Sequence, residues 1–218
     1  NIPENITLIT GSLRRSFSNN GYKVFNSLYV FKDEILDYYD KKKLVPFGEF
    51  IPLRGVLNLF KLTPGYSDYS KGEKKNEMFF FNNNSKFFFE PSICYEAIFQ
   101  TNQSKNSNLI INVTNDAWFG KTTGPRQHLA AQIFRSVEKG AFLIRVANSG
   151  ISALVNNRGY IEEKIQLGIS GHIDKTIRLE SNETFFEKYG NLALFLFIIF
   201  LFLLFCLIEF LFSLKRKY

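Results

Sequence analysis

Cysteine and histidine are scarce in this chain of 218 residues, which contains two of each. Cys206 lies in a long apolar run near the C-terminus and Cys94 lies in the remainder of the chain, so the two thiols are not expected to pair. The folded part must then be stabilised by its core and not by a disulfide. Neither histidine has a cluster of ligand residues beside it in the sequence, so no metal site is predicted.

Charge is absent from Leu192 to Ile208, and apolar residues resume after Glu209 and continue through Leu214. A run of about 20 apolar residues can cross the roughly 30 Å hydrocarbon core of a membrane as a helix. A core helix of a soluble domain would be shorter and would have a polar face. The sequence therefore predicts one transmembrane helix at residues 191–214.

Basic residues follow the predicted span directly, at Lys215, Arg216 and Lys217. The positive-inside tendency assigns residues 215–218 to a cytoplasmic tail. The folded domain, residues 1–188, is then expected on the opposite side of the membrane, which in a bacterial host is the periplasmic or extracellular side.

The chain is basic, with 27 Lys and Arg against 20 Asp and Glu and a net charge of +7. Lysines are spread along the sequence, so this balance does not predict a nucleic-acid partner. In an anchored protein, attraction to anionic membrane lipid is the more natural use of positive charge. The chain also begins without an initiator Met or a leader peptide, so further sequence is expected upstream.

Strand patterns occur in both halves of the chain. Asn5–Ser12 and Lys23–Phe31 are rich in β-branched and aromatic residues, and residues 75–86 read as a strand or loop. Residues 87–96 and 108–116 predict further apolar strands, the second with both faces covered. Short strands are expected at residues 141–148, 150–157, 159–165 and 172–180, with a turn at residues 156–159.

A helix pattern separates these strands at Gly124–Gly140, with Pro125 in its first turn and glycine at its end. Leu129, Ile133 and Val137, with Ala130 and Phe134 beside them, are expected to form one buried stripe. The alternation of strands and helix predicts a layered mixed α/β domain.

Three short stretches combine residue types that can support catalysis. They are YDKKKLVPFGEFIP at residues 39–52, ICYE at 93–96 and TNDAWFG at 114–120. Each also has an ordinary structural interpretation: a solvated lysine loop, a buried inert thiol, and a turn packed on the single Trp. The third stretch follows a buried strand, where binding sites of α/β proteins commonly form.

Together with residues 124–159, these stretches resemble, in order, the catalytic domain of the apolipoprotein N-acyltransferases, a membrane-embedded branch of the nitrilase (carbon–nitrogen hydrolase) superfamily. The resemblance runs from about Ile6 to the end of the chain, and LVPFGE with a downstream Cys-Tyr-Glu is its specific part. It implies an α/β fold, a nitrilase-like α-β-β-α sandwich without its N-terminal portion, followed by one C-terminal transmembrane helix.

The resemblance also implies roles for individual residues. The family nucleophile matches Cys94, the catalytic lysine matches Lys41, and the supporting glutamate matches Glu49. Tyr95 and Glu96 match a functionally important pair. Asn115, Asp116, Trp118 and Phe119 match a pocket-forming segment, whereas Lys42 and Lys43 match no functional position.

The implied reaction has two steps and needs no cofactor. A nearby cation makes the thiolate form of Cys94 available, and Lys41 can then stabilise the oxyanion of a tetrahedral intermediate. Cys94 would take an acyl chain from a phospholipid as a thioester. The α-amine of an N-terminal diacylglyceryl-cysteine on a lipoprotein would then accept the chain. The expected partners are therefore a phospholipid donor, a lipoprotein acceptor and membrane lipid.

One departure from the family pattern is expected to matter. The family's general-base glutamate lies in a segment well ahead of the first strand, and Glu4 is too close to that strand to replace it. Three hypotheses follow. The chain is part of an active acyltransferase completed by upstream sequence or a separately encoded N-terminal portion, or it is a catalytically inactive remnant, or it is a membrane-tethered nitrilase-type amidase. Alone, it is expected to show no turnover.

Overall fold

The computed structural model describes residues 3, 6–19, 21–52, 68–73, 75–82, 85–100, 104, 107–180 and 183–215. The chain divides into two compact units, Asn1–Asn182 and Glu183–Tyr218, and each is described by itself. The domain boundaries expected from the sequence remain predictions.

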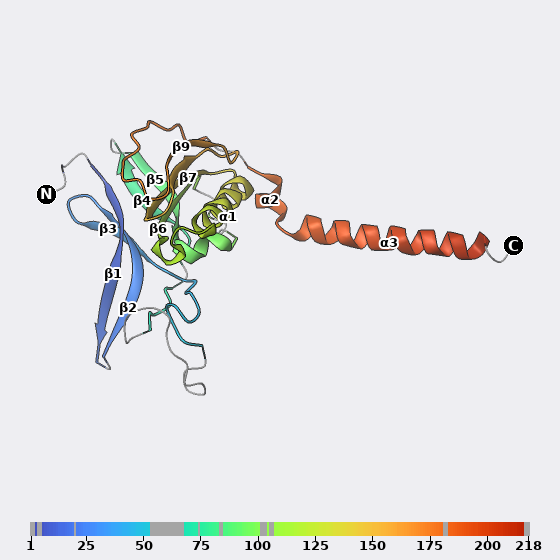
Figure 1. Ribbon diagram of the computed structural model, residues 1–218, viewed down its shortest axis with the longest axis horizontal. Coiled ribbons are helices and arrows are strands. Elements are labelled where there is room, and N and C mark those ends of the chain that lie inside the picture. Colours follow the sequence, from blue (N-terminus) through green and yellow to red (C-terminus); the bar gives the residue numbers. More distant parts are fainter. Residues whose placement is uncertain are drawn as a thin grey trace. The chain divides into compact units, whose positions relative to one another are not determined.

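A three-stranded antiparallel sheet forms the N-terminal part of the first unit (Figure 1). It contains β1 (Leu8–Ser18), β2 (Gly21–Phe31) and β3 (Ile35–Asp40), in that order. β3 was not predicted, because its acidic residues obscure the apolar pattern. Asp40 is bonded within the sheet by Arg14, whose Nη2 lies 2.6 Å from Oδ2, and Tyr39 is buried beside it.

A six-stranded sheet forms the second layer, in the order β4-β5-β6-β7-β8-β9. Its strands are β4 (Met78–Asn82), β5 (Ser85–Ile93), β6 (Leu109–Asn115), β7 (Phe142–Asn148), β8 (Ser152–Val155) and β9 (Ile161–Ile165). β5, β6 and β7 are parallel, and the outer pairs are antiparallel. The carboxyl ends of the three parallel strands therefore meet at one edge of the sheet.

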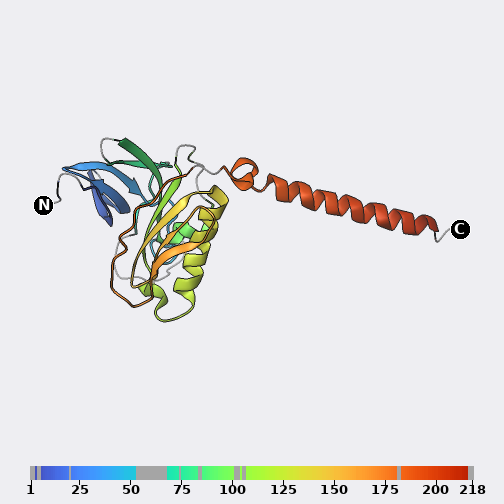
Figure 2. The same cartoon turned by 90° about the horizontal axis from the view of Figure 1, so that it is seen from above.

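Two apolar clusters hold the layers together. Leu28 and Val30 of the small sheet pack with residues of the large sheet, including Ile111. On the opposite face, Ile110 and Leu143 pack beneath helix α1 (Gly124–Lys139), which lies along that face of the sheet (Figure 2). Side chains of β6 alternate between the clusters, which confirms the prediction of a strand covered on both faces. The predicted layered α/β architecture is confirmed.

Helix α1 begins and ends where the sequence predicts. Pro125 lies in its first turn, and Gly140 ends it in the left-handed conformation at φ 68°. The predicted buried stripe is wrong in part: Leu129 is buried, but Val137 is 42% and Phe134 is 65% exposed.

The buried face of α1 is instead largely polar, because it meets polar groups of the sheet and its loops. Gln132, Ser136 and Lys139 are all buried on it. The Ser136 hydroxyl donates to the carbonyl oxygen of Ala141 at 2.6 Å. Lys139 lies 3.4 Å from Glu90 of β5.

The strand predicted at residues 172–180 is also wrong, because that segment has no regular secondary structure. Ile177 and Leu179 nevertheless pack against the cluster between the sheets. The alternating apolar residues therefore reflect burial of one side of this segment and not pairing with a neighbouring strand.

The second unit consists of α2 (Phe185–Tyr189) and α3 (Leu192–Lys215). The Thr184 hydroxyl caps α2 by accepting from the backbone N–H of Glu187 at 3.0 Å. Leu192–Phe212 has a mean hydropathy of 3.1 and none of its apolar window is buried. The prediction of one C-terminal helix long and apolar enough to cross a membrane is confirmed.

Candidate active site

A cavity of about 500 Å³ opens at the carboxyl ends of β5 and β6, beside the loop that follows β3. Its lining includes five residues singled out in the sequence: Lys41, Glu49, Cys94, Asn115 and Trp118. The fold thus brings together positions that are far apart in the chain.

Cys94 stands at the turn where β5 passes into the short 3-10 helix η1 (Cys94–Ile98). Its φ is 48°, a left-handed conformation that is unfavourable for a residue with a side chain. Phe47, at φ 61°, and Ser149, at φ 55°, share this property among the described residues. Val45, Gly48 and Asn148 beside them line the cavity. Backbone strain therefore concentrates around the cavity, as it commonly does at functional sites.

Lys41 and Glu49 form a buried ion pair in the cavity wall. The Nζ atom of Lys41 lies 2.9 Å from Oε1 and 2.8 Å from Oε2 of Glu49. Lys41 is 1% exposed and Glu49 is 9% exposed. A buried ammonium group needs such a partner, since an isolated buried charge is costly.

The loop around Glu49 fixes this carboxylate. The backbone N–H of Val45 donates to Oε2 at 2.8 Å, and the side-chain amide of Asn26 donates to Oε1 at 3.2 Å. The N–H of Phe47 donates to the carbonyl oxygen of Phe50 at 2.7 Å. The Pro-Phe-Gly-Glu sequence therefore makes a closed turn that directs its glutamate towards Lys41.

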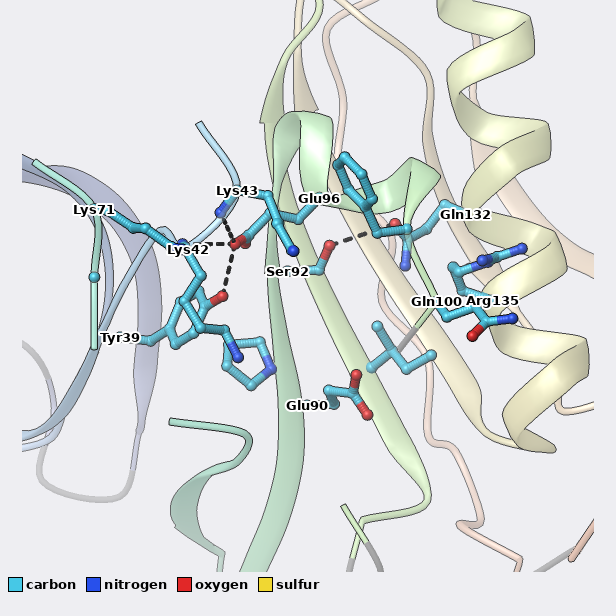
Figure 3. A pocket seen from close by; sticks show the side chains of 14 residues that line it. Tyr39, Lys42, Lys43, Lys71, Glu90, Ser92, Glu96, Gln100, Gln132 and Arg135 are labelled. Carbon is cyan, nitrogen blue, oxygen red and sulfur yellow. Dashed lines mark hydrogen bonds between the residues drawn. The ribbon is translucent and has the colours of Figure 1, made fainter. Parts of the chain in front are cut away.

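Glu96 connects the lysine loop to the segment that carries Cys94 (Figure 3). Its Oε1 accepts from the Tyr39 hydroxyl at 2.8 Å and from the N–H groups of Lys42 and Lys43 at 2.7 and 3.0 Å. Its Oε2 accepts from the N–H of Ile93 at 2.9 Å. Burial, together with the charge and hydrogen bonding of Glu96, raises the pKa of Tyr39, which therefore remains a donor.

A polar row crosses β5, β6 and β7 on the face that meets α1. Ser92, Asn112 and Arg145 are in register on the three strands. The Asn112 amide donates to the Ser92 hydroxyl at 3.1 Å, and Arg145 Nη1 donates to Asn112 Oδ1 at 2.5 Å. Arg145 is 1% exposed, so this row is part of the interior.

Asp116 and His128 extend the polar row to Cys94. Asp116 Oδ2 accepts from Arg145 Nη2 at 2.7 Å, and its Oδ1 lies 2.8 Å from Nδ1 of His128. Nε2 of the same ring lies 2.9 Å from the carbonyl oxygen of Cys94. Asp116 is completely buried. It therefore binds inward groups and does not line the cavity, unlike the role that the sequence resemblance implied.

Two pKa shifts follow from this burial. Burial raises the pKa of Asp116, but the hydrogen bond from His128 and the charge of Arg145 outweigh it and leave that pKa below its ordinary value. Burial lowers the pKa of Arg145, against the opposing charge and hydrogen bond of Asp116. The carboxylate thus stays charged in the interior.

A second, mostly apolar cavity of about 360 Å³ is also lined by Cys94. Tyr95, Trp118 and Phe119 are in its lining, with Ile98 and His128. Trp118 is 61% exposed and also borders the first cavity. Cys94 and Trp118 therefore stand where the two cavities adjoin.

A third cavity, of about 330 Å³, has Glu96 in its lining (Figure 3). Lys42 and Lys43 belong to its lining, but Lys42 Nζ donates to the carbonyl oxygen of Lys75 at 2.8 Å and Lys43 Nζ lies 5.4 Å from the centre of the Phe99 ring. Within the described residues, no group of three His, Cys, Asp or Glu side chains is arranged to hold a metal ion.

The sequence interpretation missed several residues that build the site. Asn26, Asn112 and Arg145 each lie between apolar residues of a strand. A polar or charged residue at such a position is seldom buried without partners, and this signal could have identified them. Only the fold shows which partners they bind: Asn26 bonds to Glu49, and Arg145 bonds to Asn112.

Comparison with solved structures and with models of protein families identifies the class of protein to which the chain belongs. A glutamine-dependent NAD+ synthetase structure from Acinetobacter baumannii aligns with a TM-score of 0.55 over 75% of this chain and 30% of that chain, at 17% identity, a likeness of fold alone. The carbon–nitrogen hydrolase family model matches residues 3–182. The chain belongs to the carbon–nitrogen hydrolase family, and the nitrilase-like α/β fold predicted from the sequence is confirmed.

Within this family, the chain is similar to apolipoprotein N-acyltransferases. It is 37% identical to that of Rickettsia prowazekii over 216 residues, covering 96% of this chain and 43% of the relative. It is 40% identical to that of Rhizobium etli over 183 residues, covering 78% and 33%. The resemblance stated from the motifs is confirmed, and the chain spans less than half the length of these relatives.

Proposed function

We propose that this chain carries the catalytic domain of an apolipoprotein N-acyltransferase, with Cys94 as the nucleophile. The observation that carries the proposal is the placement of Cys94 in a left-handed turn where two cavities adjoin. One cavity contains the Lys41–Glu49 pair, and the other offers an apolar surface of the kind that an acyl chain requires.

In the first step, the thiolate of Cys94 attacks the carbonyl carbon of a phospholipid ester. A C–S bond forms, and the ammonium group of Lys41, held by Glu49, stabilises the oxyanion. The ester C–O bond then breaks, and the proton given up by the thiol ends on the departing glycerol oxygen. The products are a thioester on Cys94 and a lysophospholipid.

In the second step, the free α-amine of an N-terminal diacylglyceryl-cysteine attacks the thioester. A C–N bond forms, the C–S bond breaks, and the proton lost by the amine returns to the sulfur. An amine attacks a thioester more readily than an oxygen ester, which is the chemical advantage of a cysteine nucleophile.

The remaining residues of the site have supporting roles in this proposal. Tyr95, Trp118 and Phe119 supply the apolar wall, and Asn115 supplies a polar group at the rim of the first cavity. Glu96 holds the lysine loop against η1. Asp116 does not contact Cys94 in this proposal but orients His128, which does.

The proposed location is the bacterial inner membrane. Helix α3 would span it, the basic residues after the span would be cytoplasmic, and the catalytic domain would lie on the periplasmic side. Both substrates reside in the bilayer, which gives a reason to anchor a carbon–nitrogen hydrolase domain there.

The test supplies the sequence that the longer relatives have ahead of the matched region. The chain is fused behind that portion of the Rickettsia prowazekii relative and incubated in membranes with phospholipid labelled in its acyl chain. We expect a hydroxylamine-sensitive label on the fusion that Cys94→Ala abolishes and Cys206→Ser retains. Adding a diacylglyceryl-cysteine peptide should move the label to the peptide amine.

The intact relative, labelled in parallel, is the positive control. With that control labelled, an unlabelled fusion would identify a catalytically inactive remnant, and a label surviving Cys94→Ala would reject the thioester. Ammonia release from a short amide without lipid labelling would favour a membrane-tethered amidase. The chain by itself, which spans less than half of its relatives, is expected to stay unlabelled.

A further inference from the structure

His128 links helix α1 to the residue proposed as nucleophile. It lies in the first turn of α1 and is buried. Nε2 is 2.9 Å from the carbonyl oxygen of Cys94, and Nδ1 is 2.8 Å from Oδ1 of Asp116. The ring therefore bridges a backbone acceptor and a buried carboxylate.

The partners of the ring determine its protons. A carbonyl oxygen can only accept a hydrogen bond, so Nε2 must donate to Cys94. Asp116 stays ionised because its pKa lies below the ordinary value, so its oxygen accepts from Nδ1. Asp116 Oδ1 also accepts from the Thr114 hydroxyl at 3.0 Å. Both ring nitrogens of His128 thus face oxygen acceptors, an arrangement that suits a ring with a proton on each nitrogen.

The groups around this ring make a compact charge cluster. Arg145 of β7 lies 3.2 Å from Nδ1, Asp116 follows β6, and the Phe119 ring of η2 (Ala117–Phe119) lies edge-on at 5.7 Å between centroids. With His128 protonated, the cluster holds two cations and one carboxylate. The cluster therefore carries a net positive charge next to the residue whose carbonyl oxygen it binds, Cys94.

The hydrogen bond between His128 and the carbonyl oxygen of Cys94 also constrains the strained backbone of Cys94. A left-handed residue other than glycine persists only where its surroundings fix it. The N–H of Ile93, directly before this turn, donates to Glu96, and the carbonyl oxygen of Cys94 itself is held by His128. Losing the second bond would release the carbonyl while leaving the Glu96 contacts in place.

We propose that His128 is a positioning residue which, as a doubly protonated ring, holds the carbonyl of Cys94 and places a positive charge beside its thiolate. The inference depends on the proposed function only in naming Cys94 as the nucleophile. It assigns no contact with substrate to His128.

The test measures how fast Cys94 reacts with iodoacetamide in the full chain in detergent, with Cys206→Ser removing the second thiol. Rates are compared between about pH 6 and pH 9, across the range where thiols ionise. His128→Ala should slow alkylation at neutral pH roughly tenfold, as expected when a reacting group is misplaced. It should also move the pH profile to higher pH. His128→Gln can still donate to the carbonyl but carries no charge, so it should recover part of the rate at high pH and not the profile.

Arg126→Gln, an exposed change in the same turn of α1, should match the parent protein. A His128→Ala protein with the parental rate and profile would overturn the positioning role. A His128→Gln protein with the parental profile would overturn the charged form. Circular dichroism of each variant identifies any that fails to fold.

A second measurement needs no change at His128. The chain has two histidines, so His172→Gln leaves a single ring for nitrogen-15 spectroscopy. Two protonated ring nitrogens near neutral pH are expected, and one unprotonated nitrogen would overturn the proposal even if every His128 variant misfolds. Alkylation requires no lipid, so dependence on His128 in a chain that forms no thioester would reject the proposed function and retain this inference.

Discussion

Both carboxylate oxygens of Glu49 lie within 2.9 Å of Nζ of Lys41, in a pair that is almost sealed from solvent. Removing one partner leaves the other charge buried without compensation, which typically costs about 3–5 kcal/mol. The pair therefore couples the stability of the domain to its proposed chemistry.

Glu49→Leu should lower the free energy of unfolding by about 3 kcal/mol or more, because the Lys41 ammonium loses its only carboxylate partner among the described residues. Urea unfolding of the full chain in detergent measures this. The double variant Lys41→Met, Glu49→Leu should recover much of the loss, and in the fusion with the upstream portion of the relative it should show no acyl transfer. Equal stability of the single and double variants would contradict the buried-charge explanation.

Asp116 gives the domain a defined response to acid. Its folded-state pKa is depressed, so its contribution to stability is present above the unfolded pKa of about 3.9 and is lost as the pH falls through the folded value. Asp116→Asn should therefore cost most near neutral pH, where Arg145 is left uncompensated. The difference in unfolding free energy between the parent and Asp116→Asn should shrink as the pH falls below about 4.

Urea unfolding of both proteins at neutral and acidic pH tests this directly. Asp174→Asn, at an exposed position of the segment after β9, is the matched control and should show little difference at either pH. A parent-to-variant difference for Asp116→Asn that does not change with pH would contradict the role of its ionised form.

Gly150→Ala should disturb the cluster without altering any charge. A Cβ atom at this position would stand 2.5 Å from Oδ2 of Asp116 and 2.9 Å from Cβ of Ala147. Such overpacking commonly costs about 1–3 kcal/mol. Thermal unfolding should show the loss, and Cys94 alkylation should slow because Asp116 no longer aligns His128.

Gly171→Ala is the control for this substitution. Its Cβ would meet only Ile165 at 3.7 Å or more, an ordinary contact, so stability and alkylation should stay near those of the parent. Similar effects of the two alanine substitutions would show that the clash with Asp116 is not the cause.

Glu96→Ala should detach the lysine loop from η1. Four hydrogen bonds to this carboxylate disappear, from Tyr39, Lys42, Lys43 and Ile93. The expected loss is about 2 kcal/mol or more, since the buried Tyr39 hydroxyl and Ile93 N–H are left unsatisfied. Hydrogen exchange at the amides of Lys42 and Lys43 should accelerate. Tyr39→Phe removes one of the four bonds and should cost about 1 kcal/mol, with those amides still protected.

Much of the framework could be predicted because local rules decide it. Pro125 and Gly140 bracket α1, and the apolar run at Leu109–Val113 is a covered strand. Two of the errors in the predicted fold, the strand at residues 172–180 and the buried stripe of α1, share one cause. Apolar periodicity reports which side chains are buried, but not what buries them, so Ile177 and Leu179 suggested a strand and Val137 suggested a buried position.

The site was predictable only in part for a related reason. The motif resemblance identified Lys41, Glu49 and Cys94 as candidate site residues. The fold places all three in the lining of one cavity. Asp116 carries the same motif signal but faces inward. Neither its direction nor the bond from His128 to Cys94 could be read from the sequence, because both depend on how β6, β7 and α1 pack.

The row formed by Ser92, Asn112 and Arg145 has a consequence for strand alignment. Neighbouring residues on a strand face opposite sides, so sliding β7 by a single position would drive a guanidinium into the oily space between the sheets. A chain with β7 in the wrong register is therefore destabilised by the same polar row that is linked to Cys94. In this domain, the contacts that fix the register of β5, β6 and β7 are therefore also contacts that support the proposed site.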